Sequence, residues 1–253
     1  SCYGSCSAGD PVNTSIGNFY HESKDFTMTD FDDLFLSRVY NSYGEDNSSI
    51  FGMNFSSNFE QYISYTKEDN MLFFRGDGKI LEIPKKDGKY QPKLSDKIKV
   101  KVNEKTTEIY DKTDDITYIF NEYGILYQIK TLNGFTSQIY YDDYGMIDYI
   151  QIGKKQITFE YNLCNLVKSI ALPNDTKIQY VYNADRQLTE FIDANGNKEK
   201  YTYDENGKIK SITDKKGAVL ANNTYDQNGV VLSQKDANGN LVEFSYNNTS
   251  TKV

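Results

Sequence analysis

The sequence predicts an all-β protein: a coiled antiparallel sheet of repeating β-hairpins, preceded by an N-terminal capping module. Three observations support this prediction. The 253 residues contain 22 Tyr, 14 Phe and 17 Gly, with abundant Asn and Asp and few Ala, a composition typical of strands and turns rather than helices. Apolar and polar residues alternate over short segments such as 157–161, 178–182 and 242–246, as in strands with one buried face. A short signature also recurs at a nearly constant interval through the second half of the chain.

The segment 58–119 is predicted to form irregular hairpins that lead into the regular sheet. Aromatic strand residues precede a Gly-containing turn at 75–79, and Asp87-Gly88 is a strong hairpin signal. A basic cluster lies in the same segment and consists of Lys85, Lys86, Lys89, Lys93, Lys97, Lys99 and Lys101. We interpret these residues as solvated lysines of an edge strand, which block unwanted strand pairing; a binding role is the alternative.

The segment 120–253 carries the repeat, which predicts six complete hairpins and a partial seventh. An aromatic residue followed by Asp or Asn, the repeat anchor, recurs every 20 to 22 residues. Strand, turn, strand and turn fill this interval and leave no room for a helix, so successive copies are expected to form one long sheet that coils because strands twist. The anchors are expected to lie in the core: Phe120, Tyr141, Tyr161, Tyr182, Tyr203, Tyr225 and Tyr246.

The turn after each anchor has the residues of a type I turn closed by a Gly bulge. Asp or Asn at its first position accepts backbone hydrogen bonds, and Gly at its fourth position tolerates a positive φ. Asn165 and Arg186 replace this Gly in two copies, and Arg186 is expected to be mildly strained. The turn residues with a predicted structural role are Gly124, Asp142, Gly145, Asp204, Gly207, Asp226 and Gly229.

The strand that returns from each turn carries apolar residues five and eight positions after the anchor, as at Ile209 and Ile212. Two residues three positions apart point to opposite faces of a regular strand. The pattern therefore predicts either a bulge between them or a strand that is buried on both faces.

The repeat resembles the YD repeat of the Rhs (rearrangement hotspot) family, which includes bacterial polymorphic toxins, wall-associated toxin proteins, cocoon subunits of Tc toxins and animal teneurins. The N-terminal residues resemble the module that precedes YD repeats in this family, with Phe51-Gly52-Met53-Asn54-Phe55-Ser56 in place of a motif that usually contains Trp. The other residues of this module motif are Gly9, Asp10, Pro11, Gly17, Asn18, Arg38, Tyr40 and Asn41. The resemblance implies a coiled β-sheet shell that encloses a cargo, with residues 1–57 as a cap or plug, 58–119 as leading hairpins and 120–253 as the repeat array.

The charge and the cysteine content restrict the classes of function that the chain can have. A net charge of -8 gives no basic footprint for nucleic acid, and the apolar stretches are too short to insert into and span a bilayer. Cys2 and Cys6 are either incidental thiols or a disulfide pair; the alternative is a zinc site with His21 and Cys164. The Asp and Asn residues of turns such as 193–197 suit calcium, but ordinary turn chemistry explains them. We predict no metal, no cofactor and no catalytic residue.

The sequence therefore predicts a non-catalytic scaffold, part of an Rhs-like shell that is secreted or displayed on a bacterial surface and that encapsulates or presents a C-terminal effector. Its partners would be the rest of the parent shell and that effector, because six repeats are too few to close a cage. The alternative is an adhesion module that binds carbohydrate or a cell-surface protein through exposed aromatic residues. An open sheet edge at 247–253 is expected to be capped by the N-terminal segment or to pair with another copy.

Overall fold

Strands form nearly all of the regular structure in the computed structural model, which describes residues 7–8, 12–13, 16–28, 34–43, 48–236 and 238–246. The helical structure among these residues is a single turn of 3-10 helix, η2 (Leu94–Asp96). The predicted all-β class is confirmed. No helix in this part of the chain is long and apolar enough to cross a membrane.

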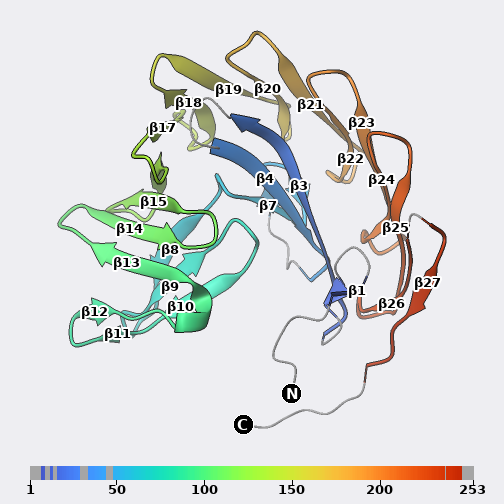
Figure 1. Cartoon of the computed structure of the whole chain (residues 1–253), viewed down its shortest axis with the longest axis horizontal. Coiled ribbons are helices and arrows are strands. Elements are labelled where there is room, and N and C mark those ends of the chain that lie inside the picture. The colour runs from blue at the N-terminus through green and yellow to red at the C-terminus, as the bar shows by residue number, and fades with distance from the viewer. Residues whose placement is uncertain are drawn as a thin grey trace. The chain divides into compact units, whose positions relative to one another are not determined.

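A 15-stranded antiparallel sheet contains the repeats, and its strands are hydrogen-bonded in the order in which they occur in the chain, from green to red in Figure 1. This order confirms the predicted succession of hairpins. The strands are β13 (Ile98–Val102), β14 (Thr106–Asp111), β15 (Ile116–Asn121), β16 (Leu126–Lys130), β17 (Thr136–Tyr141), β18 (Ile147–Ile152), β19 (Lys155–Tyr161), β20 (Val167–Ala171), β21 (Lys177–Tyr182), β22 (Leu188–Ile192), β23 (Lys198–Tyr203), β24 (Ile209–Thr213), β25 (Val219–Tyr225), β26 (Val231–Asp236) and β27 (Leu241–Glu243).

The strands before residue 98 belong to smaller sheets. A five-stranded sheet has the order β1 (Ser7–Ala8), β2 (Val12–Asn13), β3 (Asn18–Met28), β4 (Leu34–Asn41) and β7 (Phe55–Ser57). A three-stranded sheet has the order β10 (Ile80–Ile83), β9 (Met71–Phe74) and β8 (Tyr62–Tyr65). Two short pairs complete the fold: β5 (Ser48–Ser49) with β6 (Gly52–Met53), and β11 (Lys85–Lys86) with β12 (Lys89–Tyr90).

The chain divides into two compact units, and each combines N-terminal residues with hairpins of the long sheet. The first unit contains the described residues of 1–22, 39–55 and 179–253, and the second contains those of 23–38 and 56–178. In the first, Phe51 packs against Tyr180 with ring centroids 5.1 Å apart, and Phe55 packs against Tyr201 at 5.9 Å. The predicted boundaries at residues 57 and 119 stay a prediction.

The second unit is built on the same principle with different residues. Phe59 meets the ring of Phe159 edge-on at 6.4 Å, and Phe73 meets Phe120 at 5.9 Å. Along the strands that carry these rings, buried residues alternate with more exposed ones. In β15, for example, Ile116, Tyr118 and Phe120 are buried and the residues between them are partly exposed. Apolar burial of these rings supplies most of the stability of such a face, at about 25 cal/mol per Å² of area removed from water.

Candidate functional site: the tyrosine ladder and its turns

The turn between β23 and β24 shows how the repeat closes. Asp204 Oδ1 accepts hydrogen bonds from the backbone N–H groups of Asn206 and Lys208, at 3.0 and 2.8 Å. The N–H of Gly207 bonds to the carbonyl of Asp204 at 3.1 Å, and Gly207 has a φ of +76°. A carboxylate that satisfies two backbone donors fixes the turn, and glycine is favoured where φ is positive.

The other predicted turn residues lie in the same positions. Asp142 and Asp226 each accept from the N–H groups two and four residues ahead, at 2.8 to 2.9 Å. Gly124, Gly145 and Gly229 have φ values of +80°, +77° and +78°. Asn165 and Arg186, which replace this glycine, have φ values of 59° and 63°, as expected for these copies.

A bulge at the first six anchors explains the spacing of the apolar residues on the returning strands. In the β23–β24 pair the register shifts between Thr202 and Tyr203, so that Tyr201 lies opposite Ile212 while Tyr203 lies opposite Ile209. Both isoleucines are fully buried. The bulge is therefore the correct one of the two alternatives, because the extra residue turns two side chains three positions apart onto one face.

The anchor tyrosines lie at the border of the core, whereas the sequence predicted them inside it. Their side chains are half-buried, and the fully buried residues lie two positions earlier, as in Phe159 and Tyr201. The phenol hydroxyl explains the difference: it needs a hydrogen-bond partner when it leaves water, so the ring extends past the core to a backbone carbonyl.

Five of these hydroxyls, those of Tyr141, Tyr161, Tyr203, Tyr225 and Tyr246, donate to the preceding hairpin, and together they form what we call the tyrosine ladder. The acceptor is the carbonyl of the first residue of the returning strand, which lies at the bulge. Tyr161 Oη is 2.7 Å from the carbonyl oxygen of Ile147, Tyr203 Oη is 2.6 Å from that of Leu188, and Tyr225 Oη is 2.7 Å from that of Ile209. Tyr141 bonds to the carbonyl of Leu126 and Tyr246 bonds to that of Val231 in the same way.

This role of the hydroxyl was not predicted, although the sequence contains a signal for it. Phe120 is the first anchor and has no preceding hairpin of the repeat to bond; it is fully buried instead. The six later anchors are all Tyr. A position that is Phe only in the first copy and Tyr in all later ones points to a use for the hydroxyl as well as for the ring.

Three module residues lie in the first unit: Gly17, Tyr40 and Asn41. Gly17 and Tyr40 bond to its hairpins, and Asn41 bonds to another residue of the module. The carbonyl of Gly17 accepts from the N–H of Val231 at 3.0 Å, and Tyr40 Oη accepts from the N–H of Ile209 at 3.0 Å. Asn41 bonds its N–H to the carbonyl of Asn54 at 2.9 Å. Burial raises the pKa of Tyr40, because its ring has almost no contact with water.

Two other module residues have buried polar partners. Asn18 Oδ1 accepts from Ser42 Oγ at 3.0 Å in the first unit. In the second unit, Arg38 is fully buried, and its Nη2 lies 2.8 Å from Asp25 Oδ1, so that the guanidinium and the carboxylate form a bidentate pair. The motif residues Gly9, Asp10 and Pro11 lie outside the described residues.

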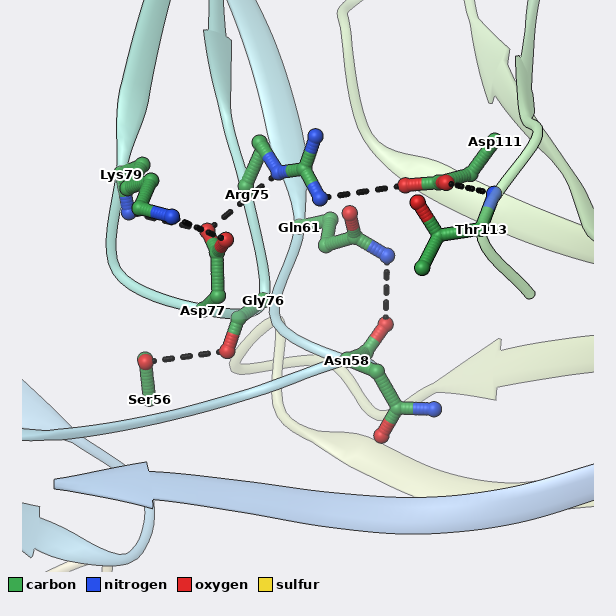
Figure 2. A network of polar contacts seen from close by, with 9 residues as sticks. All are labelled: Ser56, Asn58, Gln61, Arg75, Gly76, Asp77, Lys79, Asp111 and Thr113. Carbon is green, nitrogen blue, oxygen red and sulfur yellow. Dashed lines mark hydrogen bonds and ion pairs between the residues drawn. The ribbon is translucent and has the colours of Figure 1, made fainter. Parts of the chain in front are cut away.

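A polar network in the second unit fixes the leading hairpins to the long sheet (Figure 2). Arg75, directly after β9, places Nη2 3.1 Å from Asp111 Oδ2 in β14 and Nε 3.3 Å from Asp77 Oδ1. Ser56 Oγ donates to the carbonyl of Gly76 at 3.0 Å. A Cβ added to Gly76 would lie 2.5 Å from the Cα of Asn58. Arg75 holds two carboxylates at once, which is a structural arrangement.

The described residues contain no group of three or more His, Cys, Asp or Glu side chains arranged to hold a metal ion. Cys2 and Cys6 lie outside the described residues, Cys164 is exposed, and His21 is buried against Phe19. In the turn at 193–197, Asp193 Oδ1 accepts from the N–H groups of Asn195 and Asn197, both at 2.9 Å, which is the bonding of an ordinary turn.

Comparison with known proteins finds two family models. A domain of unknown function, DUF6531, matches residues 9–83. The teneurin YD-shell model matches residues 98–223 and 173–250. No curated protein matches the chain.

Solved structures of large toxin complexes are similar to this chain. They include TcdB2-TccC3 with Cdc42 (13% identity, 85% of this chain, TM-score 0.35), TcdB2-TccC3 (13% identity, 88% of this chain, TM-score 0.35) and the Photorhabdus luminescens Tc holotoxin pore (13% identity, 85% of this chain, TM-score 0.34). The chain spans 12% of the length of each of these proteins.

Proposed function

Because the chain belongs to the teneurin YD-shell family, a family of structural shells, we propose that it is a non-catalytic wall segment of an Rhs-like β-shell that encloses or presents a C-terminal effector. The observation that carries the proposal is the tyrosine ladder. Within each unit it joins hairpins to the ones before them, which supports growth of one sheet along the chain without a helix or a separate core.

The N-terminal strands have a matching role in this proposal. In the first unit they lie against the buried face of the hairpins through Tyr40 and Phe55. In the second unit Phe59, in the turn after β7, makes the corresponding contact with Phe159. A wall covered in this way has its inner apolar face closed to water. We assign residues 9–57 to a plug and the remainder of the parent protein, secreted or surface-displayed, to further wall and effector.

The experiment is protease protection of the parent protein. The parent gene is expressed in full, and the survival of the segment that follows the repeats is followed during limited proteolysis. We expect that segment to be protected in the parent and degraded when it is expressed alone. A parent gene that ends near Val253, or a C-terminal segment that is digested equally fast in both forms, would exclude encapsulation.

A second candidate function is adhesion, and the exposed aromatic residues of two neighbouring turns favour it. Tyr123 and Tyr144 occupy the same position of their turns and are 79% and 91% exposed. Exposed tyrosines can stack on sugars or enter a protein interface. Glycan-array binding that is lost in Tyr123→Ser/Tyr144→Ser and kept in the ladder variant Tyr203→Phe would support adhesion; an array without binding would remove it.

A further inference from the structure

A positively charged surface stands apart from the wall that the proposed function describes. It lies on the segment from β11 to β13, at the green end of the long sheet in Figure 1. All of its lysine side chains are exposed, in a chain whose net charge is -8. We call it the lysine patch: Lys86, Lys89, Lys93, Lys97, Lys99 and Lys101.

The patch includes lysines at positions where stability does not favour them. Lys86 and Lys89 lie directly opposite each other across the β11–β12 pair, and like charges in that position destabilise a hairpin. Lys97 ends η2 in the left-handed region with φ 53° and ψ 28°, where a glycine would remove the steric cost. Such costs are typical of positions kept for a function.

Five lysines of the patch form no ion pair within the part of the chain that the structure describes: Lys86, Lys89, Lys93, Lys97 and Lys99. The neighbouring Lys85 does, since its Nζ lies 2.6 Å from Asp69 Oδ2, and Lys101 lies 3.2 Å from Glu108 Oε1. The contrast is informative: acidic side chains are near enough to pair the flanking lysines but leave the centre of the patch available to an external anion.

An apolar side chain projects from the middle of this charge. Leu94, in η2, is 92% exposed and lies between Lys93 and Lys97 in the sequence. An exposed leucine with lysines on both sides in the sequence gains nothing from water or from a soluble anion. It gains free energy when it enters an apolar phase that has negative charge at its surface.

We propose that the lysine patch with Leu94 is a peripheral docking site for an anionic lipid bilayer. The lysines contact the negatively charged headgroups, Leu94 enters the boundary between headgroups and acyl chains, and the chain stays on the surface without spanning it. Attraction near an anionic surface is worth about a fivefold gain in affinity for each lysine. It acts only within about 10 Å at ordinary salt, so the acidic residues that count against it are those of the same segment, Asp87 and Asp96, which are outnumbered by the six lysines.

The first experiment uses the lack of Trp in the chain. Leu94→Trp introduces one indole at the proposed contact, and Leu163→Trp introduces one at a fully exposed hairpin turn as the matched control. Vesicles of equal parts phosphatidylglycerol and phosphatidylcholine are added to each full chain. We expect the emission of Leu94→Trp to shift to shorter wavelength and that of Leu163→Trp to stay constant. Vesicles of phosphatidylcholine alone should shift neither.

The second experiment separates the charges from the leucine by vesicle co-sedimentation. Lys86→Gln/Lys89→Gln should weaken binding to the anionic vesicles by about 25-fold. Leu94→Ser should weaken it by roughly tenfold, the worth of partly burying a leucine side chain. The control Lys200→Gln/Lys210→Gln removes two exposed lysines elsewhere and should leave binding unchanged.

Two results would overturn the proposal. One is an unshifted emission of Leu94→Trp under conditions in which the chain co-sediments with anionic vesicles. The other is equal binding of Leu94→Ser and the unmodified chain together with full competition by soluble polyglutamate, which would assign the patch to an acidic polymer or protein instead. All substituted side chains are exposed, so the variants are expected to fold; a cooperative urea transition at the unmodified midpoint checks this.

Discussion

The hydroxyl group of Tyr203 illustrates how much of the repeat depends on one atom. It lies 2.6 Å from the carbonyl oxygen of Leu188, a residue that is paired with Tyr182 next to the shift in strand register. The aromatic ring contributes burial, and the oxygen contributes the link between consecutive hairpins.

Tyr203→Phe is therefore expected to lower the free energy of unfolding by about 1 to 2 kcal/mol, because it removes a net hydrogen bond and leaves a carbonyl acceptor at the border of the core. Urea unfolding followed by circular dichroism measures this. Tyr144→Phe is the control, since Tyr144 is 91% exposed and its loss of a hydroxyl should leave the midpoint unchanged. Equal midpoints for the two variants would contradict the role given to the ladder.

At the scale of one hairpin, turns that look alike in sequence differ in what surrounds them. Gly124 and Gly145 occupy the same turn position and have φ values of +80° and +77°. A Cβ at Gly124 would lie 2.1 Å from the carbonyl oxygen of Ile63, whereas a Cβ at Gly145 would meet nothing within 4 Å. The first turn is packed against β8, and the second faces open space.

Gly145→Ala should destabilise the protein by about 1 kcal/mol, the cost of a left-handed alanine. Gly124→Ala adds a clash with backbone that has no flexible end to move, so it should cost at least twice as much. Urea midpoints of the two variants give the comparison directly. If the two costs are equal, the close approach of β8 to the first turn does not exist in solution.

The strands β3 and β4 carry a second local feature, the ion pair of Asp25 and Arg38. Asp25→Asn is expected to cost about 3 to 5 kcal/mol, because it removes the carboxylate that pairs with the buried guanidinium of Arg38. Glu190→Gln is the control: its carboxylate pairs with Lys198 at 2.9 Å near the surface and should be worth less than about 1 kcal/mol. Thermal unfolding of the two variants measures the difference, and a small effect for both would mean that water reaches Arg38.

The local sequence pattern predicted the hairpins well, but it did not predict which distant residues pack against them. Period-two alternation and the Asp-x-x-Gly turns depend on residues close in sequence, so the strands, the turns and the left-handed Arg186 follow from the chain itself. The bond from Tyr40 to the N–H of Ile209 joins residues 169 positions apart. No propensity or spacing encodes such a contact, and the depth of the anchor rings was mispredicted because a hydropathy pattern takes no account of one hydroxyl.

For the molecule as a whole, the ladder is expected to make the folded state less stable as the pH rises into the alkaline range. Burial raises the pKa of Tyr141, Tyr161 and Tyr225 above the ordinary value of 10.0. In the unfolded chain these phenols ionise near pH 10, so above that pH the folded state binds more protons than the unfolded one. Their contribution is complete below pH 10 and is lost as the pH rises toward the folded-state pKa.

We expect the urea midpoint to be insensitive to these tyrosines at neutral to mildly alkaline pH and to fall progressively above pH 10. Phenolate absorbance should rise together with unfolding rather than before it. The double variant Tyr161→Phe/Tyr225→Phe has fewer buried phenols, so its midpoint should start lower at neutral pH and decline less steeply. Parallel declines for the variant and the unmodified chain would show that other groups govern the alkaline transition.

The direction of the ladder also has a consequence for how the protein is made. Each bond runs from an anchor back to the hairpin that precedes it, as from Tyr225 to Ile209. A ribosome delivers the hairpins in the same order, so each anchor emerges from the exit tunnel after the hairpin that accepts its bond. The long antiparallel sheet can therefore add one hairpin at a time during translation, without waiting for the chain to be complete.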